Sequence, residues 1–296
     1  MISAFSQYHP IVNMAYFISV IAFGMLILHP VFLTIALLSA LSYNFILKGF
    51  KAIKTFLMFS LPMLVSVGLI NTLFNHYGVT VLYTFHSGNN LTLESIIYGL
   101  VIGVMVVTVM LWFSCYNEVV TADKFMLIFG KKIPAIALII SMSLRFVPLY
   151  QNRLKRISET QKAIGKGIND GHLLDRIKNG CRMLSILITW SLENAVETSN
   201  SMRSRGYGLK GRTTYNRHTY LKTDFLILAL IVVLDVILII GKCGGFMEAS
   251  YNPVITFGTV NAQMIALSAI YLMLCLMPVI LEIKEDIMWH RLKLKI

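Results

Sequence analysis

Six apolar stretches, each about as long as a membrane-spanning helix, dominate this chain of 296 residues. A bilayer core is spanned by roughly 20 apolar residues in a helix that rises about 1.5 Å per residue. Only 14% of the residues are charged, well below the share of about 25% in soluble domains, so a water-soluble fold is excluded. The sequence predicts an all-α polytopic membrane protein with about six membrane helices, near residues 11–28, 31–47, 55–74, 95–114, 223–241 and 260–281.

The positions of the basic residues predict how the chain is oriented. The net charge of +12 includes 26 Lys and Arg, of which none precedes Lys48 and eighteen lie between Lys124 and Lys222. Because basic loops remain in the cytoplasm, both termini are predicted to be cytoplasmic. Only Lys242 then falls in the exterior segments 29–30, 75–94 and 242–259. The basic excess therefore reports insertion in a lipid bilayer, and no nucleic-acid partner is expected.

The middle of the chain is predicted to be a long cytoplasmic helical hairpin. A first helix begins at Pro134 and becomes amphipathic beyond Pro148, where a kink is expected. Apolar residues spaced by three or four from Leu174 to Met202 predict a second helix, which Gly206 is suited to close. The predicted division is 1–114 for membrane helices 1–4, 115–222 for the cytoplasmic helices, and 223–296 for membrane helices 5–6.

Common catalytic and nucleotide-binding motifs are absent from the sequence. Gly165-Lys166-Gly167-Ile168 lacks the upstream glycine and the Ser or Thr of a phosphate-binding loop, so the chain has no visible energy source. No metal site is expected, because the histidines show no ligand spacing. The four cysteines form no CxxC pair and are expected to be reduced packing residues, at positions 115, 181, 243 and 275.

Asp235 lies near the middle of the fifth predicted span. A carboxylate there costs roughly 2.5–3.5 kcal/mol on insertion scales, and such residues usually face a bundle interior or a water-filled path. Two interpretations are open: a proton or substrate relay, and a protonated or hydrogen-bonded packing acid. The packing acid is favoured because no intramembrane basic partner is visible.

Four stretches of the sequence resemble a known transporter family. They are Pro62 through Asn75-His76-Tyr77-Gly78-Val79-Thr80, Thr121-Ala122-Asp123-Lys124, Leu144-Arg145-Phe146-Val147-Pro148, and Ser199-Asn200-Ser201-Met202-Arg203-Ser204-Arg205-Gly206-Tyr207-Gly208 with the trailing Gly211-Arg212-Thr213. Together they resemble the transmembrane T component of energy-coupling factor (ECF) transporters, which is similar to the cobalt-transport permease family.

The resemblance implies that the chain works within a complex. Its partners would be two ABC-type ATPase subunits and a small substrate-binding membrane subunit for a vitamin or a metal ion. ATP and Mg would be bound by the ATPases, and this chain would bind no cofactor. In the family, short arginine motifs at the ends of the long cytoplasmic helices insert into grooves of the ATPases. Ser204-Arg205-Gly206 matches the second motif, with Arg205 inserted and Arg203 as a helper.

The first coupling motif departs from the family pattern. Where the family has Gln-x-Ala-Arg-Gly, this chain reads Gln161-Lys162-Ala163-Ile164-Gly165, so Ile164 stands in place of the arginine. Three possibilities are open: Lys162 takes over its role, Lys166 does, or an apolar anchor suffices.

The function predicted on these grounds is an energy-coupling scaffold of an ECF-type importer in the plasma membrane of a prokaryote. ATP hydrolysis would occur in the partner subunits, so the chain itself would not be an enzyme. Two alternatives from other classes stay open. One is a membrane-embedded enzyme acting on a lipid or isoprenoid, and the other is a stand-alone proton-coupled carrier using Asp235.

Overall fold

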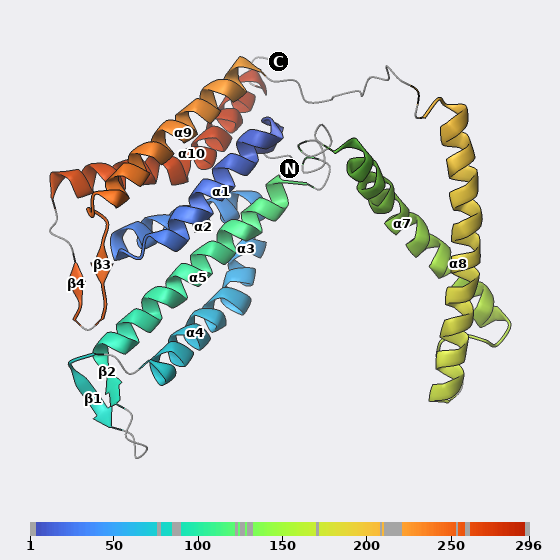
Figure 1. Cartoon of the computed structure of the whole chain (residues 1–296), viewed down its shortest axis with the longest axis horizontal. Helices are drawn as coiled ribbons and strands as arrows, with labels where there is room; N and C mark the ends of the chain where they lie inside the picture. The colour runs from blue at the N-terminus through green and yellow to red at the C-terminus, as the bar shows by residue number, and fades with distance from the viewer. Residues whose placement is uncertain are drawn as a thin grey trace. The chain divides into compact units, whose positions relative to one another are not determined.

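The apolar stretches form helices in the computed structural model, which describes residues 4–75, 78–84, 90–121, 124, 128, 133–169, 172–207, 209, 221–252, 254–257 and 261–293. The predicted all-α class is confirmed (Figure 1). Two short antiparallel pairs accompany the helices: β1 (Val81–Thr84) with β2 (Asn90–Thr92), and β3 (Ala249–Ser250) with β4 (Thr256–Phe257).

Among the described residues, five helices are long and apolar enough to cross a membrane. These are α2 (Pro30–Lys48), the continuous helix Phe50–Phe74, α5 (Leu93–Val119), α9 (Lys222–Cys243) and α10 (Ala262–Lys293). The first predicted span is α1 (Pro10–Leu26), an apolar helix of 17 residues that is shorter than the others. Both α1 and α2 begin with a histidine cap followed by a proline in the first helical position. The Nδ1 atoms of His9 and His29 each accept a hydrogen bond from the backbone N–H two residues later.

The helix Phe50–Phe74 is built from three parts: α3 (Phe50–Thr55), a π-helical segment (Phe56–Ser60) and α4 (Leu61–Phe74). Pro62 lies two residues after the end of the π-helical segment. A proline has no N–H and clashes with the carbonyl four residues earlier, and a wider turn relieves that clash. The sequence prediction placed the start of this helix at residue 55, five residues too late.

Helices α4 and α5 approach closely at glycines. A Cβ atom added to Gly99 would lie 2.8 Å from the Gly68 carbonyl oxygen, and one added to Gly103 would lie 3.0 Å from the Leu64 carbonyl oxygen. Small residues spaced by four let helix backbones meet within a bilayer. The rest of α4 exposes its apolar side chains, as expected of a helix facing lipid.

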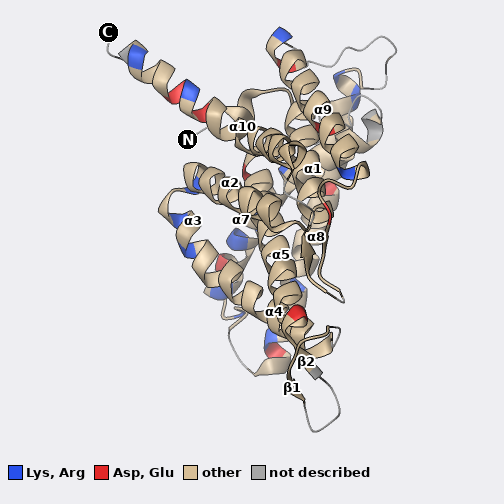
Figure 2. Ribbon diagram, turned by 90° about the vertical axis from the view of Figure 1, so that its left-hand side faces the viewer, with Lys and Arg blue, Asp and Glu red and all other residues tan. Residues whose placement is uncertain are grey.

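The last third of α10 extends beyond the predicted end at residue 281. Charged residues occupy these turns, whereas the preceding ribbon is almost free of them (Figure 2). The hydropathy signal ends where the apolar residues end, but Glu and Lys are good helix formers and the helix continues. Hydropathy therefore located the span and missed the helix end.

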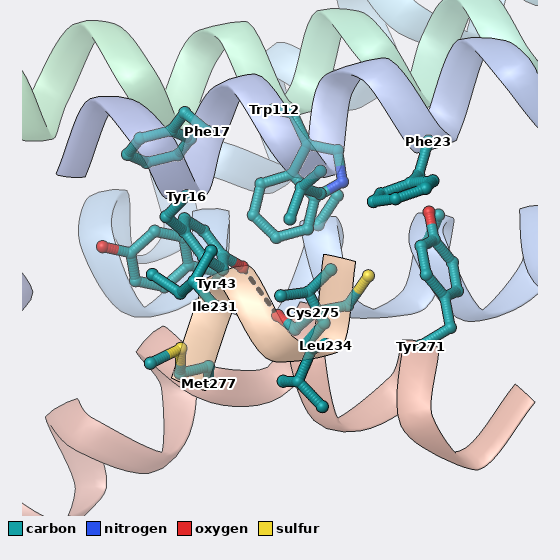
Figure 3. Close-up of a cluster of buried hydrophobic side chains, with 14 of the residues drawn as sticks. Tyr16, Phe17, Phe23, Tyr43, Trp112, Ile231, Leu234, Tyr271, Cys275 and Met277 are labelled. Atoms are coloured by element: carbon teal, nitrogen blue, oxygen red, sulfur yellow. Dashed lines mark hydrogen bonds between the residues drawn. The ribbon is translucent and has the colours of Figure 1, made fainter. Parts of the chain in front are cut away.

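Aromatic side chains fill the core of the membrane helices. Trp112 of α5 is fully buried, and its ring centroid lies 6.0 Å from that of Tyr16 and 6.4 Å from that of Tyr43. The Tyr16 hydroxyl donates a hydrogen bond to the Cys275 carbonyl oxygen at 3.0 Å, joining α1 to α10 (Figure 3). Cys115 and Cys275 are buried in this core, as expected of packing residues, whereas Cys181 and Cys243 are exposed in the chain.

The chain divides into two compact units. The membrane unit comprises Met1–Phe125 and His218–Ile296, and the hairpin unit comprises Met126–Arg217. The hairpin unit contains α7 (Pro134–Ala163) and α8 (Leu173–Ser204), so both predicted long helices are present. Pro148 lies inside α7, and a kink there stays a prediction.

Candidate functional site

The first candidate coupling motif closes α7 in a well-defined turn. Gly165 has a φ of 70°, in the left-handed region where glycine is favoured. Its N–H donates to the Lys162 carbonyl oxygen at 3.0 Å, and the Lys166 N–H donates to the Gln161 carbonyl oxygen at 2.9 Å. This pair of bonds is the Schellman motif, which satisfies carbonyl groups that a helix end leaves unpaired.

The second motif closes α8 in the same way. Gly206 has a φ of 76°, its N–H donates to the Arg203 carbonyl oxygen at 3.0 Å, and the Tyr207 N–H donates to the Met202 carbonyl oxygen at 3.0 Å. The left-handed glycine predicted from the sequence is therefore confirmed. Gly208, Gly211, Arg212 and Thr213, which belong to the same predicted stretch, lie outside the described residues.

The two helix ends match position by position. Ile164 and Arg205 each stand immediately before the left-handed glycine, and both are exposed. Lys162 corresponds to Arg203, and Ala163 corresponds to Ser204. Lys166 corresponds to Tyr207, directly after the glycine. The isoleucine thus occupies the backbone position of the arginine, whereas the two lysines flank it.

The two ends lie far apart along α8. The turn after α7 is held near the start of α8, because the Asn179 side chain donates a hydrogen bond to the Gly167 carbonyl oxygen at 3.0 Å. Arg205 follows Asn179 by 26 positions in sequence. A helix of that length extends about 39 Å at about 1.5 Å per residue. The hairpin unit therefore presents two similar turns at well-separated points.

The two helices of the hairpin are joined by a small mixed core. Met183 is almost completely buried, and Ile157 is also buried. The guanidinium of Arg153 lies 4.8 Å from the ring centroid of Trp190, a cation–π contact, and the Tyr150 ring meets the same indole edge-on at 5.9 Å. These contacts fix α7 against α8 between the two turns.

A groove lies beside the second motif. It has a volume of about 490 Å³ and is lined by Met142, Phe146, Ala195, Thr198, Ser199, Met202, Arg203 and Tyr207. Phe146 belongs to the Leu144–Pro148 stretch that carries the resemblance. Arg203 therefore borders a groove, while Arg205 is the exposed residue at the helix end. Tyr207 was not predicted to line a groove, because Phe146, which lines the same groove, is 61 positions away in the sequence.

Gly78 and Thr80 have a structural role at the start of α5. The Thr80 backbone N–H donates to the Glu94 carboxylate at 3.2 Å, and the Thr80 hydroxyl donates to it at 2.5 Å. A Cβ atom on Gly78 would lie 2.5 Å from the same carboxylate, so glycine is required there. His76 and Tyr77 lie outside the described residues, as do Ala122 and Asp123 of the second stretch.

Asp235 contacts α1 across the helix bundle. Its Oδ2 atom lies 2.5 Å from the Ser19 hydroxyl oxygen, which is also 2.9 Å from the Ala15 carbonyl oxygen. A hydroxyl has one proton and a carbonyl only accepts. The Ser19 hydroxyl therefore donates its proton to the Asp235 carboxylate or to the Ala15 carbonyl oxygen, or shares it between them. Asp235 therefore has a hydrogen-bonding partner on α1, and both the packing acid and the relay stay predictions.

No group of three or more His, Cys, Asp or Glu side chains close enough to hold a metal ion occurs among the described residues. His86, which shares the predicted exterior loop with His76, is also outside them. The described part of the chain therefore holds no candidate metal centre.

Comparisons with known proteins agree with the resemblance. No family model matches the chain. The energy-coupling factor transporter transmembrane protein EcfT of Lactobacillus helveticus is 36% identical over 142 residues, which cover 46% of this chain and 51% of that protein. The protein of the same name from Staphylococcus aureus is 28% identical over 212 residues, or 68% of this chain and 76% of that protein. The one from Streptococcus thermophilus is 36% identical over 110 residues, or 36% and 42%.

The strongest of these alignments spans about half the length of the relative. The names of these proteins describe a transmembrane protein of a transporter, in agreement with the prediction that this chain is a transporter subunit and not an enzyme. The resemblance predicted from four sequence stretches is thus confirmed: the chain is a relative of the energy-coupling factor transporter transmembrane proteins, the T components of that transporter class.

Proposed function

We propose that this chain is the energy-coupling scaffold of an ECF-type importer. It would receive motion from two ABC-type ATPases and pass it to a small substrate-binding membrane subunit, which takes up a vitamin or a metal ion. One observation carries the proposal: the hairpin unit ends two helices in the same exposed turn, at points about 39 Å apart along one helix of 1.5 Å rise per residue. Two such turns suit two partner subunits.

The chemistry of the two turns supports docking rather than catalysis. Arg205 offers five N–H donors in a planar fork and keeps its charge at every physiological pH. Such a group binds carboxylates and backbone carbonyls with fixed geometry. Ile164, at the matching position, offers only apolar surface, and we assign it the role of an apolar anchor. Lys162 and Lys166 would flank that anchor as Arg203 and Tyr207 flank Arg205.

Transmission would rely on the stiffness of the hairpin. ATP binding would bring the two ATPases together, and this movement would act on the two turns that they hold, at the ends of α7 and α8. A pair of helices pinned by the Trp190 and Met183 contacts resists bending, so a displacement at either turn is carried along the helices. The mechanism gives this chain no bond to make or break, and ATP with its Mg would stay in the partners.

Co-purification tests the proposal. The tagged chain is expressed together with the two ATPases encoded nearest to its gene and purified from membranes. We expect the two ATPases to be retained in a 1:1:1 ratio, or one ATPase in a 2:1 ratio. Absence of any ATPase from the purified chain, with the chain itself folded, would refute the scaffold. Net substrate movement by the chain alone in proteoliposomes would instead favour the carrier.

The orientation is tested with native cysteines. Cys181 lies in the hairpin unit and Cys243 at the end of α9, and both are exposed, whereas the other two are buried. In variants that keep one exposed cysteine each, a membrane-impermeant maleimide should label Cys243 on intact cells. Cys181 should be labelled only after the membrane is opened. Labelling of Cys181 on intact cells would overturn the orientation.

Substitution of Asp235 distinguishes the scaffold from the stand-alone carrier. If Asp235 is a protonated packing acid, Asp235→Asn keeps a donor toward Ser19 and should reduce transport less than tenfold. Ser19→Ala is the matched change on the other side of the hydrogen bond and should have a similarly small effect. Complete loss of transport in Asp235→Asn, with the complex intact, would support a proton relay and the carrier.

A further inference from the structure

The N-terminal segment Ala4–His9 is held by residues that lie far away in the sequence. The Ala4 and Phe5 N–H groups donate to the Glu282 carboxylate of α10 at 2.9 and 3.3 Å. The Gln7 side-chain amide donates to Glu285 at 3.2 Å. The segment forms one turn of 3₁₀ helix over Phe5–Gln7, and the Phe5 ring is fully buried. A short terminal stretch is thus anchored to the opposite end of the chain.

Lys124 ties the same segment to the end of α5. Its ammonium group donates to the Ser6 hydroxyl at 2.8 Å, to the Ser6 carbonyl oxygen, and to the Val119 carbonyl oxygen at 2.9 Å. Three donors therefore meet three acceptors, and Val119 is the last residue of α5. The contact caps carbonyls at the negative end of that helix. Lys124 is only 7% exposed, and burial lowers its pKa to about 8.

Asp224 makes the equivalent connection to α9. One carboxylate oxygen accepts from the His9 N–H at 3.3 Å, and the other accepts from the Leu221 N–H at 3.0 Å. His9 is the residue that caps α1, and Leu221 is the residue that precedes α9. Asp224 is 2% exposed. A single buried carboxylate therefore joins the starts of α1 and α9.

Lys124 and Asp224 lie close in sequence to the two points at which the chain leaves the membrane unit for the hairpin unit and returns to it. Lys124 is the last residue but one of the first part of the membrane unit, which ends at Phe125, and Asp224 follows the return of the chain at His218 by six positions. We propose that Ala4–His9, Lys124, Asp224 and Glu282 form an N-terminal clasp, which anchors both connections of the hairpin unit to α1, α5, α9 and α10. This role rests on the proposed function. Because the clasp links four membrane helices, motion of the hairpin unit would move these helices together.

The clasp itself is tested by hydrogen exchange on the purified chain in nanodiscs. The Ala4, Phe5 and His9 N–H groups are direct reporters, because each donates to a clasp carboxylate. Lys124→Met keeps the alkyl stem and removes the donors, and should speed exchange of peptide 4–9 at least tenfold. Lys48→Met is the matched control. Lys48 also lies at a helix end and donates to one side chain, Ser114, at 2.6 Å, and its loss should change that peptide less than twofold.

Lys124→Arg separates geometry from charge. The guanidinium keeps the positive charge, but its flat fork does not fit three converging acceptors. The clasp therefore predicts that Arg behaves as Met does, whereas a residue needed only for its charge would be restored by Arg. Wild-type exchange in Lys124→Arg would overturn the clasp. If Lys124→Met does not fold, Ser6→Ala removes one of the three acceptors and should still speed exchange about threefold.

The coupling role is tested in the complete complex, by substrate uptake per ATP hydrolysed in proteoliposomes. Lys124→Met should retain the ATPases at the wild-type ratio and lower uptake per ATP at least fivefold, while Lys48→Met stays within twofold. Normal uptake per ATP in Lys124→Met, with exchange of peptide 4–9 accelerated, would refute the coupling role alone. Failure of the wild-type chain to retain ATPases would refute the proposed function and the coupling role, and would leave the exchange result as a statement about the fold.

Discussion

The ends of α7 and α8 have the same backbone and different side chains. Each closes with a Schellman motif around a left-handed glycine, yet the residue before the glycine is Ile164 in one and Arg205 in the other. The backbone sets where a side chain is displayed, and the side chain sets what it can bind. One turn geometry is therefore built twice in this chain with chemically different exposed side chains, and under the proposed function the two ATPase contacts are expected to differ.

Reversing the charge at Arg205 should have the largest effect. If Arg205 inserts into an ATPase groove, Arg205→Glu places a carboxylate where a guanidinium binds, and disrupting such a pair costs roughly 2–5 kcal/mol, or about 30-fold or more in affinity. Co-purification of the ATPases and their substrate-dependent turnover measure it. Arg156→Glu, an exposed reversal on α7, is the control and should be neutral. If the Arg205→Glu variant assembled with the ATPases as the wild type does, Arg205 would not be a docking residue.

Shortening Ile164 should weaken assembly less. Ile164→Ala removes an apolar anchor worth roughly 1–3 kcal/mol when buried in a partner. Ile168→Ala is the control, because Ile168 is exposed in the same turn and stands outside the matched positions. If Ile164→Ala bound the ATPases as tightly as the wild type, the first ATPase contact would be assigned to Lys162 or Lys166 instead. Ile164→Arg sharpens the test: it should be tolerated only where the partner groove is acidic.

Changing the two glycines should have the smallest effect, on stability. Gly165→Ala and Gly206→Ala force a Cβ into the left-handed region, at roughly 1–2 kcal/mol each. Gly206→Ala should cost more, because its Cβ would lie 3.0 Å from Leu209 Cδ1, while nothing lies within 4 Å at Gly165. Gly180→Ala, inside α8, should instead stabilise by about 0.5–1 kcal/mol. Thermal unfolding measures all three, and a stabilised Gly206→Ala would show that the turn opens.

Local signals in the sequence predicted most of the helices and the turn that closes α8 at Gly206. Hydropathy located the spans, three-and-four spacing located α8, and Gly206 marked its end. What the sequence did not reveal depends on contacts between distant residues. The pairing of Lys124 with Ser6, for example, joins residues 118 apart. The charged end of α10 was missed because hydropathy reports membrane burial and not helix length.

The clasp also has a consequence for the time course of synthesis. Ala4 and its partner Glu282 are 278 residues apart, so the N-terminus emerges from the ribosome long before its anchor exists. At about 5–20 residues per second, the delay is roughly 14–56 s. During that interval α1 has to be retained in the bilayer by its own apolar side chains, and the last helix to be made completes the attachment of the first. Loss of the final turns of α10 by truncation would therefore remove the carboxylates that hold Ala4, Phe5 and Gln7.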